Sequence, residues 1–191
     1  MNKKQSGATI QMPDPETWVD QYGDSLYRYA LARTQDPAIA EDLVQETFLA
    51  ALRARDTFKG NSSEKTWLTG ILKHKIIDYI RKKSREQPVD NFDSFIGDMD
   101  ELFDEKGHWK VGPAKWAVNP MKLLEQKEFW KVFSRCLSGL SSRLAQAFWL
   151  REMDGLSSDE IRKILNVTAT NSYVILSRAR MRMRNCLEIK W

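Results

Sequence analysis

Tyrosine, serine and arginine side chains line one side of a predicted helix near the end of the chain, over residues 168–187. This polar set comprises Tyr173, Ser177, Arg178, Arg180 and Arg184. It lies beside an apolar stripe at steps of three and four, which comprises Ser172, Leu176, Ala179, Met183 and Leu187. Such spacing is typical of an amphipathic helix. Guanidinium and hydroxyl groups on its open side can bind the phosphates and base edges of a nucleic acid.

A shorter helix is expected directly before this one. Ser157 and Glu160 have the S-x-x-E spacing of a capping box, which starts a helix after Ser157. After a break at residues 166–167, either Thr168 or Thr170 can cap the arginine-bearing helix. Two short helices, a tight turn and arginines on the second helix are the helix-turn-helix pattern, whose second helix enters the DNA major groove. Arginine-rich faces are also common on helices that only meet solvent, so this segment alone leaves both interpretations open.

A second cationic helix is expected over residues 65–85. Its predicted buried side comprises Trp67, Leu68, Ile71, Leu72, Ile76, Tyr79 and Ile80. The remaining charged positions, with only Asp78 opposing them, are Lys73, His74, Lys75, Arg81, Lys82, Lys83 and Arg85. Like charges at this spacing repel one another on an isolated helix. A phosphate backbone relieves that repulsion and adds counterion release, so a second nucleic-acid surface is predicted.

Residues 36–55 predict a helix with an acidic polar face. Asp36 and Pro37 suit its cap and its first position. The side expected to face a core comprises Ile39, Leu43, Phe48 or Thr47, Ala51 and Leu52. The opposite side comprises Asp42, Gln45, Glu46 and Leu49, again at helical spacing. By itself, such a face is ordinary solvent-facing polarity.

No arrangement of side chains predicts catalysis or a resident cofactor. The sequence has no nucleophile next to a base, no paired carboxylates in a plausible cleft and no glycine-rich phosphate loop. Cys136 and Cys186 have no metal-like spacing, and His74 and His108 are isolated, so neither a metal site nor a cofactor is expected. Both cysteines are interpreted as reduced, partly buried thiols of a cytosolic protein.

Helical periodicity throughout, with no β pattern, predicts an all-α chain of two small domains. Residues 1–15 are expected to be a flexible tail, 16–86 the first domain, 87–119 a linker and 120–191 a second, four-helix domain. The linker is acidic, and contains Phe92, Phe95, Ile96, Leu102, Phe103, Trp109 and Trp116. A solvated linker rarely carries so many large apolar groups, so they either dock on the flanking domains or enter a groove on a partner.

The charge of the chain is segregated along the sequence. The net charge is +4 over 191 residues, but basic residues cluster at 73–85 and 178–184, and acidic residues at 86–105. Two separate basic patches suit a protein that meets an anionic polymer. No apolar run approaches the ~20 residues that span a bilayer, and the polar start does not resemble a signal peptide. We therefore expect a cytoplasmic protein without membrane insertion.

Four stretches, in this order, resemble the extracytoplasmic-function (ECF) sigma factors of bacterial RNA polymerase. They are AEDLVQETFLAALRARDTFKG, TWLTGILKHKIIDYIRKKSR, LSSRLAQAFWLREMDGLSSDEIRKILNV and LSRARMRMR. Each stretch alone is a weak signal, whereas the four at these spacings, with an acidic linker between them, are specific. The resemblance covers nearly the whole chain after about Trp18 and implies sigma region 2 in the first domain and region 4 in the second.

The resemblance also implies partners and contact residues. Core polymerase, through its β′ clamp helices, would be held by Asp42, Gln45, Glu46 and Leu49. The −10 promoter element would be read and opened by Lys59, Asn61, Ser62, Lys73, His74, Lys75, Arg81 and Lys82. The −35 element would be read by Thr170, Asn171, Tyr173, Ser177, Arg178 and Arg180. Further implied partners are the β flap of the polymerase and an anti-sigma factor that covers these surfaces.

Two positions depart from the family pattern. His74 stands where some relatives carry asparagine beside a flipped −10 base, and Tyr173 stands where a relative carries arginine. The preferred bases at both elements are therefore open. A stand-alone helix-turn-helix regulator is the alternative function; it accounts for residues 155–187 but not for the two helices at 36–85. Such a regulator would bind duplex DNA unaided, whereas a sigma factor needs core polymerase.

Overall fold

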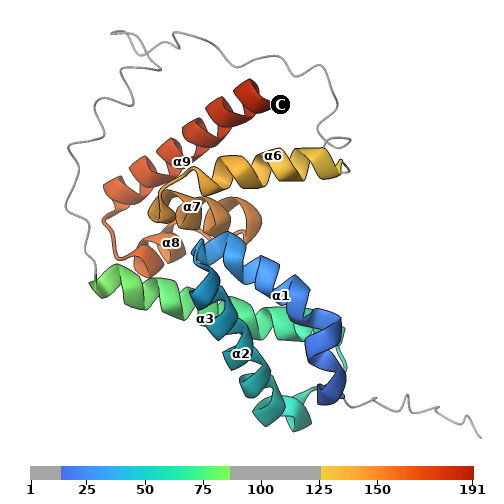
Figure 1. The fold of residues 1–191 in the computed structure, drawn as a ribbon. Coiled ribbons are helices and arrows are strands. Elements are labelled where there is room, and N and C mark those ends of the chain that lie inside the picture. Colours follow the sequence, from blue (N-terminus) through green and yellow to red (C-terminus); the bar gives the residue numbers. More distant parts are fainter. Residues whose placement is uncertain (1–13, 87–125) are drawn as a thin grey trace, which may run out of the picture. The chain divides into compact units, whose positions relative to one another are not determined.

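The computed structural model describes residues 14–86 and 126–191, and every regular element in these ranges is helical (Figure 1). The α-helices are α1 (Trp18–Thr34), α2 (Pro37–Ala54), α3 (Glu64–Glu86), α6 (Lys127–Ser138), α7 (Ser142–Phe148), α8 (Ser158–Leu165) and α9 (Ala169–Lys190). Short segments complete them: η1 (Pro15–Thr17) and η2 (Arg55–Thr57) are 3-10 turns, and η3 (Trp149–Met153) is a π-helical turn. The all-α prediction is confirmed. Nearly all of the predicted tail, the predicted linker and the first residues of the predicted second domain lie outside the described residues.

Contacts within the chain divide it into two units, with the boundary between Tyr79 and Ile80. This boundary falls inside α3, which continues without interruption to Glu86. The sequence instead places the end of the first domain after residue 86, where the helix ends. The two units are described separately below.

A helical hairpin of α1 and α2 forms the frame of the first unit. Gln35 adopts the left-handed conformation (φ 55°) that ends α1. Asp36 then caps α2, since its Oδ1 accepts hydrogen bonds from the amides of Ala38 (3.0 Å) and Ile39 (3.2 Å). The two helices pack along each other. The predicted start of α2 is confirmed, and the tight connection fixes which faces of the two helices meet.

The third helix contributes a fully buried stripe, Leu68, Leu72, Ile76 and Ile80, each at most 1% exposed. Its first turn meets α1 through the rings of Trp67 and Trp18, whose centroids are 5.9 Å apart in an edge-to-face arrangement. The indole N–H of Trp18 donates to Glu64 Oε2 (3.2 Å). This packing agrees with the prediction that Trp67 serves the core.

One core prediction for α2 is wrong. Leu52 is 52% exposed, although the sequence pattern assigns it to the buried side. The buried positions of this helix run through Leu43, Thr47 and Ala51, and the Thr47 hydroxyl donates to the carbonyl of Leu43 (2.7 Å). A residue directly after Ala51 is turned by ~100° away from that stripe, so Leu52 leaves the core and joins the outer side.

The described part of the second unit comprises the end of α3 from Ile80 and the helices α6, α7, α8 and α9, and α9 packs against α6, α7 and α8 (Figure 1). The predicted apolar stripe of α9 is buried at Ser172, Leu176, Ala179 and Met183, while Leu187 is half-buried. Val174 and Ile175 are also buried, which the three-and-four pattern did not predict. A helix that contacts three neighbours buries a wider arc than a single stripe.

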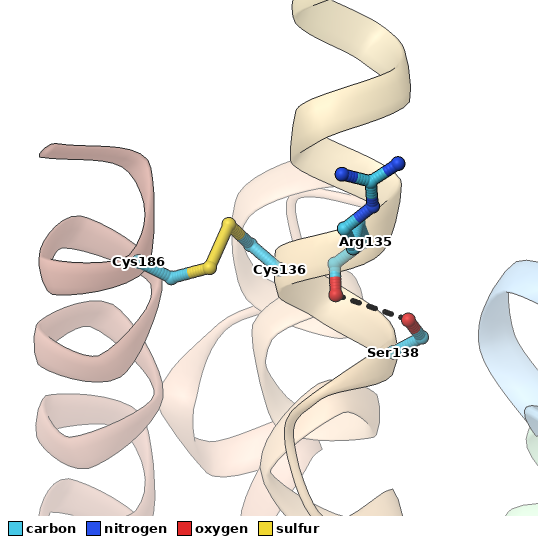
Figure 2. Close-up of a disulfide and its surroundings, with 4 residues drawn as sticks. All are labelled: Arg135, Cys136, Ser138 and Cys186. Carbon is cyan, nitrogen blue, oxygen red and sulfur yellow. Dashed lines mark hydrogen bonds between the residues drawn. A yellow bond between two sulfur atoms is a disulfide. The ribbon is translucent and has the colours of Figure 1, made fainter. Parts of the chain in front are cut away.

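The two cysteines form a disulfide between α6 and α9, so the prediction of reduced thiols is wrong (Figure 2). The Cα atoms of Cys136 and Cys186 are 5.7 Å apart, within the range that a disulfide spans. Cys136 is 2% exposed, and the adjacent turn of α6 is closed by the Ser138 hydroxyl, which donates to the carbonyl of Arg135 (3.0 Å). A sequence separation of 50 residues hides this proximity, because only the packing of α6 on α9 creates it.

Candidate functional site

The helix-turn-helix predicted near the end of the chain is present as α8 and α9. Ser157 and Glu160 make the reciprocal capping box at the start of α8, with the Ser157 amide donating to Glu160 Oε2 (2.8 Å). Asn166 ends α8 in the left-handed conformation (φ 52°). Thr168 caps α9, because its Oγ1 accepts from the amide of Asn171 (3.2 Å), which decides between the two predicted caps. Polar side chains at each boundary therefore set the turn between the helices.

An arginine from α7 supports this turn from the inside. Arg143 Nη2 donates to the carbonyl of Leu165, the last residue of α8, at 2.6 Å. Partial burial lowers the pKa of the Arg143 guanidinium from its usual value. The contact satisfies one of the carbonyls that a helix end leaves without an intrahelical partner. The position of α8 relative to α7 is thereby linked to the hydrogen bonding of the turn.

The residues predicted to read the −35 element divide between two sides of α9. Thr170, Tyr173 and Arg180 are exposed, and Tyr173 is the most exposed of the large hydrophobic side chains on this helix at 75%. Ser177 is half-buried and follows Tyr173 by four residues, so it shares their face. Asn171 and Arg178 are half-buried. The helical turn places Arg178 well away from the Tyr173 face, and its Nε and Nη2 atoms are inaccessible to solvent.

A shallow pocket of about 300 Å³ lies along the exposed face of α9. Its walls come from α8, α9 and the turn before them, and they include Arg151, Ser158, Arg162, Tyr173 and Arg180. Arg180 is held there by Glu152, whose Oε1 accepts from Arg180 Nε (2.8 Å) and lies 2.7 Å from Nη2. The pocket thus gathers three guanidinium groups and the Asp159 carboxylate beside Tyr173, and the guanidinium groups can donate hydrogen bonds to an anionic partner.

The predicted −10 residues lie on the loop before α3 and on the middle and end of that helix. Lys59, Asn61 and Ser62 are exposed in that loop, where Gly60 supplies a positive φ of 66°. Phe58 anchors the loop by packing its ring on Trp67, with centroids 5.1 Å apart. On the helix, His74 and Lys82 are exposed, whereas Lys73, Lys75 and Arg81 are half-buried. The predicted residues therefore extend from the loop, which rests on the rings of Phe58 and Trp67, along α3 to its last turns.

The predicted polymerase-binding residues form an exposed strip along α2. Asp42, Gln45, Glu46 and Leu49 are all exposed, and Leu49 reaches 55%. Leu52, three residues further, extends the strip, so its apolar end comprises two leucines. Sequence reasoning missed Leu52 because an apolar residue at helical spacing was assigned to the core. The two exposed leucines lie one helical turn apart on the same side of α2 as the acidic residues, so they add apolar surface to the strip.

One ion pair connects the α2 strip with the surface of α3. Lys75 Nζ lies 2.9 Å from Glu46 Oε2, with the lysine side chain 26% exposed and the carboxylate side chain 60% exposed. The structure therefore brings together a residue predicted to contact polymerase and one predicted to contact DNA. Nothing in the sequence pattern indicates this pairing, because the two residues belong to different helices.

Within residues 14–86 and 126–191, no cluster of three histidine, cysteine or acidic side chains could hold a metal ion. In the same ranges, none of the helices combines the length and apolarity that a bilayer-spanning segment requires.

Comparisons with known proteins match both units. Residues 18–86 match the family model described as "Sigma-70 region 2", and residues 131–183 match "Sigma-70, region 4". The chain is 36% identical over 181 residues to a "Probable RNA polymerase sigma factor" of Haemophilus influenzae, covering 90% of this chain and 89% of the relative. It is 31% identical over 144 residues to the "ECF RNA polymerase sigma-E factor" of Escherichia coli K12, covering 75% of this chain and 71% of the relative. A solved structure with a similar chain is the sigma factor RpoE bound to the anti-sigma factor NepR, from Bartonella quintana. The TM-score is 0.43 at 24% identity, over 92% of this chain and 98% of that one.

Proposed function

Because the chain belongs to the ECF RNA polymerase sigma factors, we propose that its exposed α2 strip binds the β′ clamp helices of core polymerase. The exposed acidic and apolar side chains of this strip carry the proposal, since no core packing requires them there. Asp42, Glu46 and Leu49 would meet the polymerase, and Leu52 would extend the contact. The loop at residues 58–63 and the open side of α3 would then meet the −10 element.

The exposed face of α9 is proposed to read the −35 element in duplex form. Its opposite side is buried by α6, α7 and α8, so the face with Thr170, Tyr173, Ser177 and Arg180 is the one that would enter a groove. Arg178 stays a predicted contact residue, although its guanidinium is partly covered. The second unit would also contact the β flap of the polymerase.

Each DNA surface is small, so neither is expected to give strong specific binding alone. Phosphate contacts position a protein without specifying a sequence. When polymerase holds both units, recognition becomes bivalent and effective concentration replaces intrinsic affinity. At the −10 element, extrusion of a base costs a few kcal/mol, which a pocket for that base recovers. The exposed loop residues Asn61 and Ser62, with His74, are the candidates for that pocket.

Membership of a family that acts on RNA polymerase also bears on the catalytic activity and the location of the chain. We propose that it has no catalytic activity of its own and works in the cytoplasm, where polymerase and promoters are found. We further propose an anti-sigma protein as its negative regulator, on the basis of the resemblance stated above. That protein would cover the α2 strip or the α9 face and release them on a signal.

Run-off transcription with core polymerase and a genomic promoter library tests the proposal. We expect transcripts only when the chain and core polymerase are both present, and no shift of duplex DNA by the chain alone. A stand-alone regulator would give the opposite pattern, with a tight DNA shift unaided and no dependence of transcription on the chain. The recovered start sites give the promoter that the experiments below use.

Tyr173→Ala should reduce transcription from that promoter by about five- to a hundredfold, the effect of losing one good groove contact. The side chain is 75% exposed, so the melting temperature of the chain should not change. Ile189→Ala is the matched control, because Ile189 is 73% exposed near the other end of the same helix. Equal transcription by wild type and Tyr173→Ala would remove this residue from the interface.

Lys82→Gln should flatten the salt dependence of promoter binding by the holoenzyme. Each phosphate contact contributes about one unit to the slope of log affinity against log salt concentration. The Lys82 side chain is 78% exposed, and its Nζ lies 4.0 Å from Glu86 Oε1. An exposed ion pair of this length is too weak to keep the lysine away from DNA. The control is Lys127→Gln at the exposed start of α6. An identical slope for Lys82→Gln and wild type would show that this lysine meets only solvent.

A further inference from the structure

We infer that Glu152 is a positioning residue for −35 recognition, because it holds the Arg180 guanidinium in one orientation on the exposed face of α9. The inference rests on the proposed role of that face. Glu152 belongs to neither helix of the helix-turn-helix, and neither the sequence patterns nor the family resemblance assigned it a function.

Glu152 reaches α9 because the chain leaves α7 through a π-helical turn, η3. The wide turn is closed by the amide of Asp154, which donates to the carbonyl of Trp149 (2.9 Å). The amide of Leu156 donates in turn to the carbonyl of Leu150 (2.9 Å). Leu150 is 2% exposed, so the turn is anchored in the core. Such π-helical insertions are frequent at functional sites, since they redirect a side chain by one position.

The contact itself defines which edge of the guanidinium faces outward. Glu152 Oε1 accepts from Arg180 Nε at 2.8 Å and lies 2.7 Å from Nη2. A guanidinium is planar with donors in a fixed fork, so a carboxylate on its Nε side directs the Nη1–Nη2 edge away from itself. That edge can donate two parallel hydrogen bonds to the O6 and N7 atoms of guanine, or to a phosphate.

Position and surroundings make this edge available to DNA. The Arg180 side chain is 52% exposed and that of Glu152 is 37% exposed, so the pair is accessible while anchored at one end. Both Arg180 and Tyr173 line the same pocket. Arginine carries a large rotamer entropy, and fixing it before binding reduces the entropy lost in the complex. Glu152 therefore favours specific contacts even though its negative charge opposes the approach of phosphates.

The charge of Glu152 and its hydrogen bond to Arg180 should have opposite effects on DNA binding. Removing the Glu152 charge should raise the affinity for non-specific DNA, because one repulsion is lost. It should also lower discrimination at the −35 element, because Arg180 loses its fixed orientation. Asp159 provides a matched control: it lines the same pocket, its side chain is 69% exposed, and it pairs with Arg162 rather than with Arg180. Asp159→Asn removes the same charge without releasing Arg180.

The test measures run-off transcription by the reconstituted holoenzyme from the identified promoter and from variants substituted singly at each −35 base pair. We expect Glu152→Gln to reduce discrimination about three- to tenfold, at the base pair where Arg180→Ala does so. The double variant Glu152→Gln/Arg180→Ala should be no worse than Arg180→Ala. Asp159→Asn should leave discrimination unchanged, and its melting temperature should match that of Glu152→Gln.

Three results would overturn the inference. If Glu152→Gln changes all promoters equally while Arg180→Ala alters discrimination, Glu152 contributes only charge. If Glu152→Gln still acts in the Arg180→Ala background, it does not work through Arg180. If Arg180→Ala itself leaves discrimination unchanged, the assignment of Arg180 to the −35 element fails, and the inference fails with it.

Discussion

The double variant Asp42→Ala/Glu46→Ala is expected to bind core RNA polymerase about ten- to a hundredfold more weakly than the wild-type chain. Both carboxylates are exposed on α2, and close charge pairs across an interface contribute about 1.5–7 kcal/mol in measured cases. Helix α2 keeps its buried side, so the fold should persist. A binding titration with core polymerase, together with the melting temperature of each variant, measures both quantities.

The control for this variant is Asp20→Ala/Asp24→Ala, which removes the same charge from α1. Both aspartates are exposed and lie outside the α2 strip, so polymerase affinity should not change. Glu46→Ala also breaks the ion pair with Lys75, but an exposed pair contributes only about 0–1 kcal/mol to stability. Unchanged polymerase affinity in Asp42→Ala/Glu46→Ala would refute the assignment of this strip to the polymerase.

Local signals in the sequence were sufficient to predict most helix boundaries. Asp36 before a proline, the spacing of Ser157 and Glu160, and the threonine before α9 each produced the expected cap. These are interactions over two or three residues, so their geometry depends little on the rest of the fold. The same holds for the buried stripe of α3, where four apolar residues at helical spacing are fully covered.

Features that depend on packing between elements were not predictable in the same way. Leu52 fits an amphipathic pattern, yet the direction in which α2 meets its neighbours exposes it. The Glu46–Lys75 and Glu152–Arg180 pairs join residues 29 and 28 positions apart, and no local rule selects those partners. Candidate contact residues could therefore be named from the sequence, whereas the ion pairs that Lys75 and Arg180 form required the structure.

The disulfide between Cys136 and Cys186 also joins residues that are far apart in the sequence. Its removal has the largest expected effect on the stability of the chain. A cross-link between residues 50 positions apart restricts the unfolded chain. For a loop of that length, the chain-entropy model gives a stabilisation of about 4 kcal/mol. Since domains are stable by only about 5–15 kcal/mol, reduction should remove a large part of the stability of the second unit.

Urea unfolding of the full chain, with and without a reducing agent, measures this contribution. We expect the oxidised wild-type chain to unfold with a free energy about 3–4 kcal/mol higher than the reduced chain. Cys136→Ala/Cys186→Ala should match the reduced chain and be insensitive to the reducing agent; alanine is chosen because Cys136 is 2% exposed and a hydroxyl there would need a partner. Equal stability of the oxidised and reduced chains, or two free thiols by mass spectrometry of the untreated protein, would contradict the prediction.

The caps of Ser157 and Thr168 lie far along the chain from Cys186, so the helix-turn-helix should still form after reduction, with fraying concentrated at the last turns of α9.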